Sequence, residues 1–177
     1  MRGFSLLEAL AVLAIAAILL GVALPSLQSL VGSVRTTSAA NDLLADLLLA
    51  RTEALKRRRR VVLCKSADGS GCTVSGEWQQ GWIVFVDTNE DGVRGAGEPV
   101  LQRQNPLGSA VHLTGNASLA KYVAYVANGT TRQTGGGFQA GTLTICRASN
   151  GPTTARQIVI NATGRPRVQR TEVAGCV

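Results

Sequence analysis

The chain has 177 residues, which is enough for one folded domain beside a long helix and too few for several domains. Lysine and arginine (18 residues) outnumber aspartate and glutamate (11 residues), and the net charge is +7. This charge fits a polyanion or an anionic surface as partner, and it is equally compatible with a basic protein that binds neither. The four cysteines and 20 glycines are typical of a small β-rich domain outside the cytoplasm.

The first 25 residues form the most distinctive segment. From Phe4 to Leu24 the sequence is almost entirely apolar and carries one charged residue, Glu8. A helix over residues 4–24 would be about 31 Å long, which matches the hydrocarbon core of a bilayer. A single carboxylate in such a helix costs about 2.5–3.5 kcal/mol, so we expect Glu8 to have a functional partner.

Three interpretations of this segment compete. A cleaved secretory signal would use residues 21–23 (GVA) as its cleavage site, but Glu8 at the start of the apolar run and a single basic residue, Arg2, count against it. A plain membrane anchor explains the length and leaves the carboxylate unexplained. A third interpretation accounts for the length, the carboxylate and the residues that flank the apolar run.

This third interpretation rests on a resemblance. Residues 2–8 (RGFSLLE) resemble the processing site of type IV pilins and type II secretion pseudopilins, and Gly3, Phe4, Glu8 and Pro25 all stand where that family has them. The resemblance implies that a prepilin peptidase removes residues 1–3 and that Phe4 becomes the methylated N-terminus. It also implies that Glu8 pairs with the N-terminal amine of a neighbouring subunit, which makes a buried carboxylate tolerable.

Residues 25–60 continue the helix with a different surface. Pro25 removes one helical hydrogen bond and predicts a kink or a locally melted turn. Beyond it, apolar residues recur at spacings of three and four: Leu27, Leu30, Val31, Val34, Leu43, Leu44, Leu47, Leu48, Ala54 and Leu55. This spacing predicts an amphipathic helix whose apolar stripe a globular domain covers. The run at 56–60 (KRRRR) is expected to close the helix, either as a solvated end or as a phosphate-binding patch.

Residues 61–177 are predicted to form a periplasmic β domain. Short β-branched or aromatic runs alternate there with Gly-, Asn- and Asp-rich turn clusters. The runs cover residues 61–64, 81–86, 99–101, 111–113, 122–126, 142–146 and 157–160. Seven such strands predict antiparallel sheets, two of them packed face to face, with the N-terminal helix against one.

The four cysteines predict disulfides, because an export element with an even cysteine count favours them over a metal site. Cys64 and Cys72 bracket a short polar loop, whereas Cys146 and Cys176 join a strand to the C-terminus. Of the three possible connectivities we favour Cys64–Cys72 and Cys146–Cys176, since the first is local and the second holds a tail that would otherwise fray.

Several segments together resemble the GspH/FimT family of minor pilins and pseudopilins. They are residues 50–54 (ARTEA), 62–64 (VLC), Trp78, 81–87 (GWIVFVD), Asn89 and 91–92 (DG). Cys146 and the closing segment 164–167 (GRPR) with Cys176 look most like the FimT branch. The resemblance implies a type IV pilin-like fold of class α+β, in which a long N-terminal helix, transmembrane in its first half, packs on an antiparallel β-sandwich.

The FimT branch is implicated in DNA uptake during natural transformation, through a Gly-Arg-x-Arg segment that contacts DNA. The resemblance places these contacts at Arg165 and Arg167, with Gly164 permitting the turn, and Arg170 is a candidate third contact. Guanidinium groups at alternate positions present planar forks of donors to phosphate, and Pro166 stiffens the pair. The alternative is a hairpin turn with solvated arginines. Two or three contacts predict weak, salt-sensitive binding without sequence preference.

One further segment matches the twelve-residue pattern of a calcium loop. Asp87, Asn89 and Asp91 supply oxygen ligands at the first, third and fifth places, and Glu98 stands at the twelfth. The segment lacks flanking helices, because a predicted strand precedes it and a proline follows it. Asp, Asn and Gly also form ordinary hairpin loops, so a calcium site and a hairpin loop both remain as interpretations.

The sequence contains little that indicates a catalytic site. The single histidine, His112, lies in an apolar strand, and no Cys-x-x-Cys pair, Walker loop or nucleophile elbow is present in the sequence. Trp78 and Trp82 are candidates for stacking on bases, although Trp82 lies in a strand typical of a core. We therefore expect no enzyme and no cofactor other than calcium.

The sequence thus predicts a minor pilin subunit in the bacterial inner membrane, with its C-terminal domain in the periplasm and outside the cell once it is assembled in a pilus. Its expected partners are the prepilin peptidase, other pilins or pseudopilins, the inner-membrane assembly platform and DNA. The alternative is a structural pseudopilin of a type II secretion system, or a pilus-assembly initiator, without affinity for DNA.

Overall fold

The computed structural model describes the backbone of residues 6–176 and the side chains of residues 6–21 and 30–176. The predicted processing site at Gly3 and Phe4 lies outside the described residues. The chain divides into two units, Met1–Arg35 and Thr36–Val177, and each is described by itself.

The described part of the first unit is helical and belongs to α1 (Leu6–Arg57). The helix is continuous through Pro25, so the expected melted turn is absent there. Its large apolar side chains face solvent, and Leu6 is 82% exposed. Within the described residues, no helix has both the length and the apolar character that a membrane span requires.

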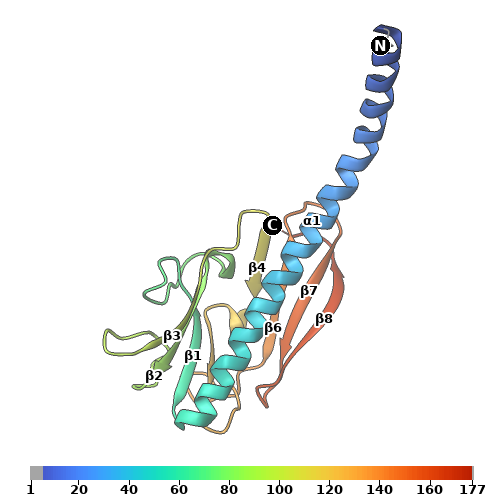
Figure 1. Ribbon diagram of the computed structural model, residues 1–177. Helices are drawn as coiled ribbons and strands as arrows, with labels where there is room; N and C mark the ends of the chain where they lie inside the picture. The colour runs from blue at the N-terminus through green and yellow to red at the C-terminus, as the bar shows by residue number, and fades with distance from the viewer. Residues whose placement is uncertain (1–5, 177) are drawn as a thin grey trace. The chain divides into compact units, whose positions relative to one another are not determined.

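The second unit contains two four-stranded antiparallel sheets (Figure 1). The first sheet has the order β3-β2-β1-β5 and consists of β1 (Arg60–Lys65), β2 (Trp82–Asp87), β3 (Val100–Gln104) and β5 (Tyr122–Tyr125). The second has the order β4-β6-β7-β8 and consists of β4 (Val111–Gly115), β6 (Gly141–Arg147), β7 (Thr153–Ile160) and β8 (Pro166–Val173). Two short 3₁₀ helices, η1 (Trp78–Gln80) and η2 (Ala117–Leu119), lie in the connections.

Each of the seven predicted strands overlaps an observed one, and β8 was not predicted. Its sequence, PRVQRTEV, is mostly polar and carries Pro166 as its first residue. Such a composition is disfavoured in a central strand but tolerated at an edge, where one row of backbone groups has no neighbouring strand. β8 is an edge strand of the second sheet, so its strand conformation depends on its pairing with β7 and not on its own sequence.

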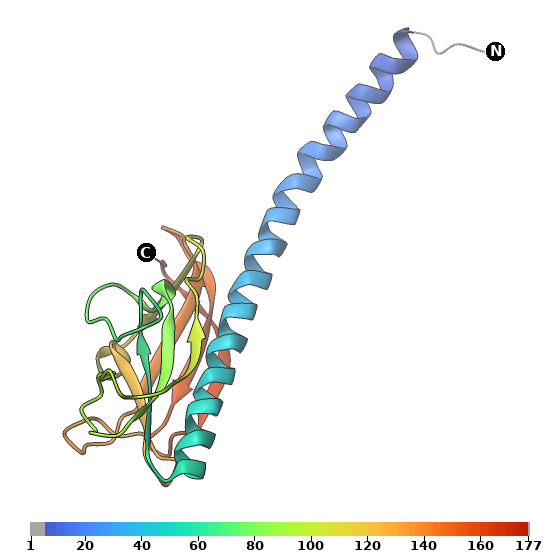
Figure 2. The same ribbon diagram turned by 60° about the vertical axis from the view of Figure 1, so that its left-hand side comes forward.

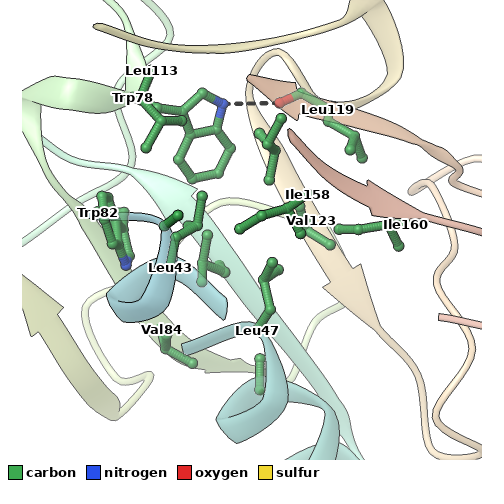
Figure 3. Packing of buried hydrophobic residues seen from close by; sticks show 14 of the residues in the cluster. Leu43, Leu47, Trp78, Trp82, Val84, Leu113, Leu119, Val123, Ile158 and Ile160 are labelled. Atoms are coloured by element: carbon green, nitrogen blue, oxygen red, sulfur yellow. Dashed lines mark hydrogen bonds between the residues drawn. The ribbon is translucent and has the colours of Figure 1, made fainter. Parts of the chain in front are cut away.

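The core lies between the helix and both sheets (Figures 2 and 3). Leu43 and Leu47 of α1 are fully buried, and a buried leucine side chain contributes about 1.5–3 kcal/mol. On one side, Trp82 Nε1 of β2 donates a hydrogen bond to Asp46 Oδ2 of the helix at 2.8 Å. On the other, Arg156 Nε of β7 donates to Thr37 Oγ1 at 3.0 Å. The helix therefore packs on both sheets, whereas the sequence analysis expected it to pack on one.

Both favoured disulfides are present, Cys64–Cys72 and Cys146–Cys176. The first lies in a small apolar cluster on the outer face of the first sheet, which is why every residue of β1 and β2 is buried. The second fastens the chain end to β6, and Ser149 and Cys176 exchange backbone hydrogen bonds of 2.9 and 2.8 Å beside it. The C-terminal tail is thus a fixed part of the domain.

Candidate nucleic-acid interface

The turn between β7 and β8 carries the predicted DNA contacts. Gly164 has a φ of +76°, and a Cβ atom there would lie 2.3 Å from the carbonyl oxygen of Gly129. Only glycine fits this position, because any other residue is both strained and in collision with backbone. The Gly164 N–H donates to Asn161 O at 2.8 Å, and the Arg165 N–H donates to Asn161 Oδ1 at 3.1 Å. The turn is therefore fixed by its own hydrogen bonds and by its neighbour.

Arg165 and Arg167 are both exposed, and neither forms an ion pair with another described residue. Arg167 stands opposite Val159 in the β7–β8 ladder, whereas Arg170 stands opposite Arg156. Because side chains alternate between the faces of a strand, Arg170 lies on the opposite face from Arg167. The prediction that Arg170 extends the pair as a third contact is corrected accordingly: Arg170 lies on the face of β8 that it shares with Arg156.

The basic run at 56–60 does not act as one unit. The helix ends at Arg57 rather than at the predicted residue 60, and Arg58 adopts a left-handed φ of +51°. Lys56 and Arg57 both pair with Glu53, and the hydrogen bond from Arg57 lowers the pKa of that carboxyl. Arg60 is buried in β1. The run is thus divided between a paired helix end, an exposed connection and a core residue.

A buried ion pair joins β1 to β2 and was missed by the sequence analysis. Arg60 Nε lies 3.3 Å from Asp87 Oδ2, and the two residues are directly opposite in the strand register. Arg60 also donates from Nη2 to Arg132 O at 3.0 Å. Burial raises the pKa of Asp87, and the hydrogen bond from Gly92 N and the Arg60 charge oppose that rise. The sequence does contain a signal for this pair, because a charged residue stands at one end of each of two apolar strand segments.

The Asp87–Glu98 loop does not fit a calcium ion. The Arg60 guanidinium already occupies one side of Asp87, with its Nε 3.3 Å from Asp87 Oδ2, and this oxygen also accepts the Gly92 N–H at 3.0 Å. Glu98 accepts hydrogen bonds from the Thr88 N–H at 2.7 Å, the Thr88 hydroxyl at 2.9 Å and the Gly95 N–H at 2.8 Å. In the described part of the chain, no three His, Cys, Asp or Glu side chains form a group suited to a metal. The calcium interpretation is therefore replaced by that of a hairpin loop closed by its own carboxylates.

Side chains available for base stacking are limited by burial. Trp78 and Trp82 are both fully buried, and the Trp78 indole N–H donates to Leu119 O at 2.9 Å (Figure 3). Neither ring is open to a nucleotide. The exposed aromatic ring among the described residues is that of Phe138, which is 61% exposed and carries the Arg132 guanidinium 4.7 Å from its centroid.

Comparison with known proteins identifies the family. Residues 39–164 match the family model described as type II transport protein GspH. The chain belongs to the GspH family. This family comprises pilin-like structural proteins and not enzymes, and the chain is a minor type IV pilin or pseudopilin.

Individual relatives agree with this assignment. The chain is 38% identical over 88 residues to the pilin-like protein PilA1 of Thermus thermophilus, and the match covers 50% of this chain and 49% of that protein. The chain thus spans about half the length of the curated relative that it matches.

Solved structures share the fold. The type IV minor pilin FimU of Pseudomonas aeruginosa is similar with a TM-score of 0.57 and 22% identity, over 80% of this chain and 94% of that one. The minor pseudopilin EpsH from the type 2 secretion system of Vibrio cholerae is similar with a TM-score of 0.53 and 15% identity, over 76% and 96% of the two chains. At these identities the likeness establishes the long helix and the antiparallel sheets.

Proposed function

We propose that this minor pilin is of the FimT type and binds the DNA backbone weakly and without sequence preference, for uptake in natural transformation. Arg165 and Arg167 make the contacts, and Gly164 holds the turn that presents them. The observation that carries the proposal is this turn, which Asn161 and the carbonyl of Gly129 fix in place while both guanidinium groups stay exposed.

Physical chemistry supports the assignment in two ways. A turn that is ordered before binding lowers the entropy that a ligand must remove, so a small number of contacts still yields measurable affinity. Arginine presents a rigid fork of donors to phosphate oxygens, and the burial of both tryptophans withdraws them from contact with bases. Several copies in one filament would raise the avidity of individually weak sites.

The test is a DNA titration of the full-length protein in mild detergent at low salt. The double variant R165Q/R167Q is expected to bind a short duplex at least about tenfold more weakly than the unmodified chain. The control is R103Q/R147Q, which removes two exposed arginines of β3 and β6 and therefore the same net charge. Equal affinities for the two double variants would refute the assignment of Arg165 and Arg167.

The N-terminal segment is part of the same proposal. We propose that a prepilin peptidase cuts after Gly3, that Phe4 is methylated, and that residues 4–24 hold the subunit in the inner membrane until the assembly platform adds it to a filament. The exposed apolar side chains of the first unit support this, because they need lipid or neighbouring helices to cover them. Mass spectrometry of the native protein should find a methylated Phe4; an N-terminus at Met1 contradicts the proposal.

A second candidate function is a structural one. The matched family is named for type II transport, which favours a pseudopilin or an assembly initiator that has no affinity for DNA. On this alternative, deletion of the gene abolishes secretion or piliation, and the R165Q/R167Q variant restores it fully. The DNA-binding proposal also predicts that this variant restores assembly, but it predicts that transformation stays low.

A further inference from the structure

Three segments far apart in the sequence meet beside the Gly164 turn. A Cβ atom on Gly164 would lie 2.3 Å from Gly129 O, so the β7–β8 turn lies against the turn that follows β5. A Cβ atom on Gly129 would lie 3.3 Å from both Arg51 Nε and Leu55 Cδ2 of α1. The β7–β8 turn is therefore joined through Gly129 to the last turns of the helix.

A second set of contacts brings the connection after the helix to the same place. The Tyr125 ring would lie 3.1 Å from a Cβ atom on Gly164. Tyr125 pairs with Val61 in the ladder between β5 and β1. Arg58 and Arg59 immediately precede β1, and the helix end and the start of β1 lie at the lower end of the domain in Figure 1. Arg58 and Arg59 thus stand within three residues of Val61, whose ladder partner Tyr125 contacts the Gly164 turn.

This end of the domain carries charges of both signs, because the loop after Asp87 adds the exposed carboxylates of Glu90 and Asp91. Glu53 pairs with Lys56 and Arg57, and Asp87 pairs with Arg60. Of the remaining cations, Arg132 stacks on the Phe138 ring. Arg51, Arg58, Arg59, Arg165 and Arg167 have no ion pair within the described part of the chain. We call this set of five arginines the basic end.

Arg51 is the least mobile member of the basic end. It is half-buried, and its Nε atom is enclosed without a hydrogen-bond partner in the described structure, as is the Tyr125 hydroxyl. Packing against Gly129 holds the side chain in place. Arg51 therefore places a fixed positive charge beside Gly129, independently of the sequence motif.

We propose that the basic end is one continuous phosphate-binding surface, in which Arg51, Arg58 and Arg59 extend the contacts of Arg165 and Arg167 along a nucleic-acid backbone. The proposal rests on the DNA-binding function above and enlarges its site. A nucleic acid suits the surface because it offers a row of phosphates to cations from two separate segments.

The number of contacts can be measured by salt dependence. Each phosphate neutralised on duplex DNA contributes about −0.9 to the slope of log affinity against log salt concentration. Arg165 and Arg167 alone therefore predict a slope of about −1.8, whereas all five arginines predict about −4.5. A slope near the larger value supports the enlarged site.

The decisive experiment compares three double variants of the full-length protein in detergent, titrated with a short duplex at several salt concentrations. R58Q/R59Q is expected to lose at least about tenfold in affinity at low salt and to flatten the slope by about 1.8. R165Q/R167Q is expected to do the same. R103Q/R147Q, with the same change in net charge, is expected to keep the original slope. Thermal melting of each variant confirms that it is folded.

Other outcomes separate this inference from the function on which it rests. If R165Q/R167Q weakens binding and R58Q/R59Q behaves like the control, the enlarged site is refuted and the proposed function stands. If neither variant differs from the control, both are refuted. If R58Q/R59Q loses affinity for vesicles of anionic lipid but keeps its affinity for DNA, the surface serves a membrane and the inference is overturned.

Discussion

The Asp87–Glu98 loop and the Gly164 turn are both charged motifs that match a binding pattern in the sequence. In the structure, the carboxylates of the loop that match the pattern have partners within the protein, whereas the arginines of the turn are exposed. In the loop, every carboxylate that would hold a cation accepts hydrogen bonds from its own segment or pairs with Arg60. In the turn, the backbone is fixed by neighbouring groups and the arginines are left exposed. A motif is available for binding only when the fold satisfies its backbone and leaves its charges unpaired.

The largest expected effect on stability concerns the Asp87–Glu98 loop and its ion pair with Arg60. Replacing Arg60 by Met leaves Asp87 buried beside no cation, and loss of one member of a buried pair costs about 3–5 kcal/mol of the free energy of unfolding. Chemical denaturation measures this loss. Arg59→Met is the matched control, because Arg59 is exposed one residue away and its change is expected to stay within about 0.5 kcal/mol. Equal losses in the two variants would contradict the role of the pair.

A somewhat smaller effect on stability is expected from a substitution in the Gly164 turn. Gly164→Ala adds left-handed strain of about 1–2 kcal/mol and a collision with Gly129 O, so we expect a total loss of at least about 2 kcal/mol. Gly135→Ala is the control, because a Cβ atom there has nothing within 4 Å. The comparison would fail if both alanine variants melted at the temperature of the unmodified protein.

A pH titration sharpens the comparison. Burial alone would raise the pKa of Glu98, but hydrogen bonds from the Gly95 and Thr88 N–H groups lower it below its usual 4.5. Since the folded pKa is depressed, the stabilisation is complete above pH 4.5 and is lost as the pH falls through the folded value. Glu98→Gln should remove this part of the acid dependence, and Asp87, whose pKa is raised, acts in the opposite sense. Glu90→Gln, in the same loop but exposed, serves as control; an identical acid profile in all three proteins contradicts the assignment.

The smallest expected effect is that of calcium. Because Arg60 lies beside Asp87 and the loop backbone donates hydrogen bonds to Glu98, added calcium should leave the melting temperature unchanged relative to added magnesium. A rise specific to calcium would show that the loop opens to admit the ion.

The sequence predicted those features that local pattern determines. The amphipathic spacing around Leu43 and Leu47 located the buried face of the helix, and the apolar runs located seven strands. Cysteine positions relative to these runs were enough to favour both disulfides. Each of these depends on residues close in the sequence or on alternatives few enough to rank.

Features that depend on strand register were not predictable in this way. Arg60 appeared to belong to the helix end, because only its pairing with Asp87 across two strands places it in the core. Arg170 seemed to continue the arginine pair, because the period-two alternation that separates it from Arg167 requires β8 to be a strand. The proximity of Arg51 to the Gly164 turn arises from tertiary packing alone.

The most direct test observes the arginine side chains themselves. Nuclear magnetic resonance of the Nε–Hε groups, recorded while a short duplex is added, reports which guanidinium groups meet phosphate. The account predicts shifts for Arg165 and Arg167, together with Arg58 and Arg59, and none for Arg103 and Arg147. Shifts confined to Arg103 and Arg147, or no shift at any arginine, would contradict it.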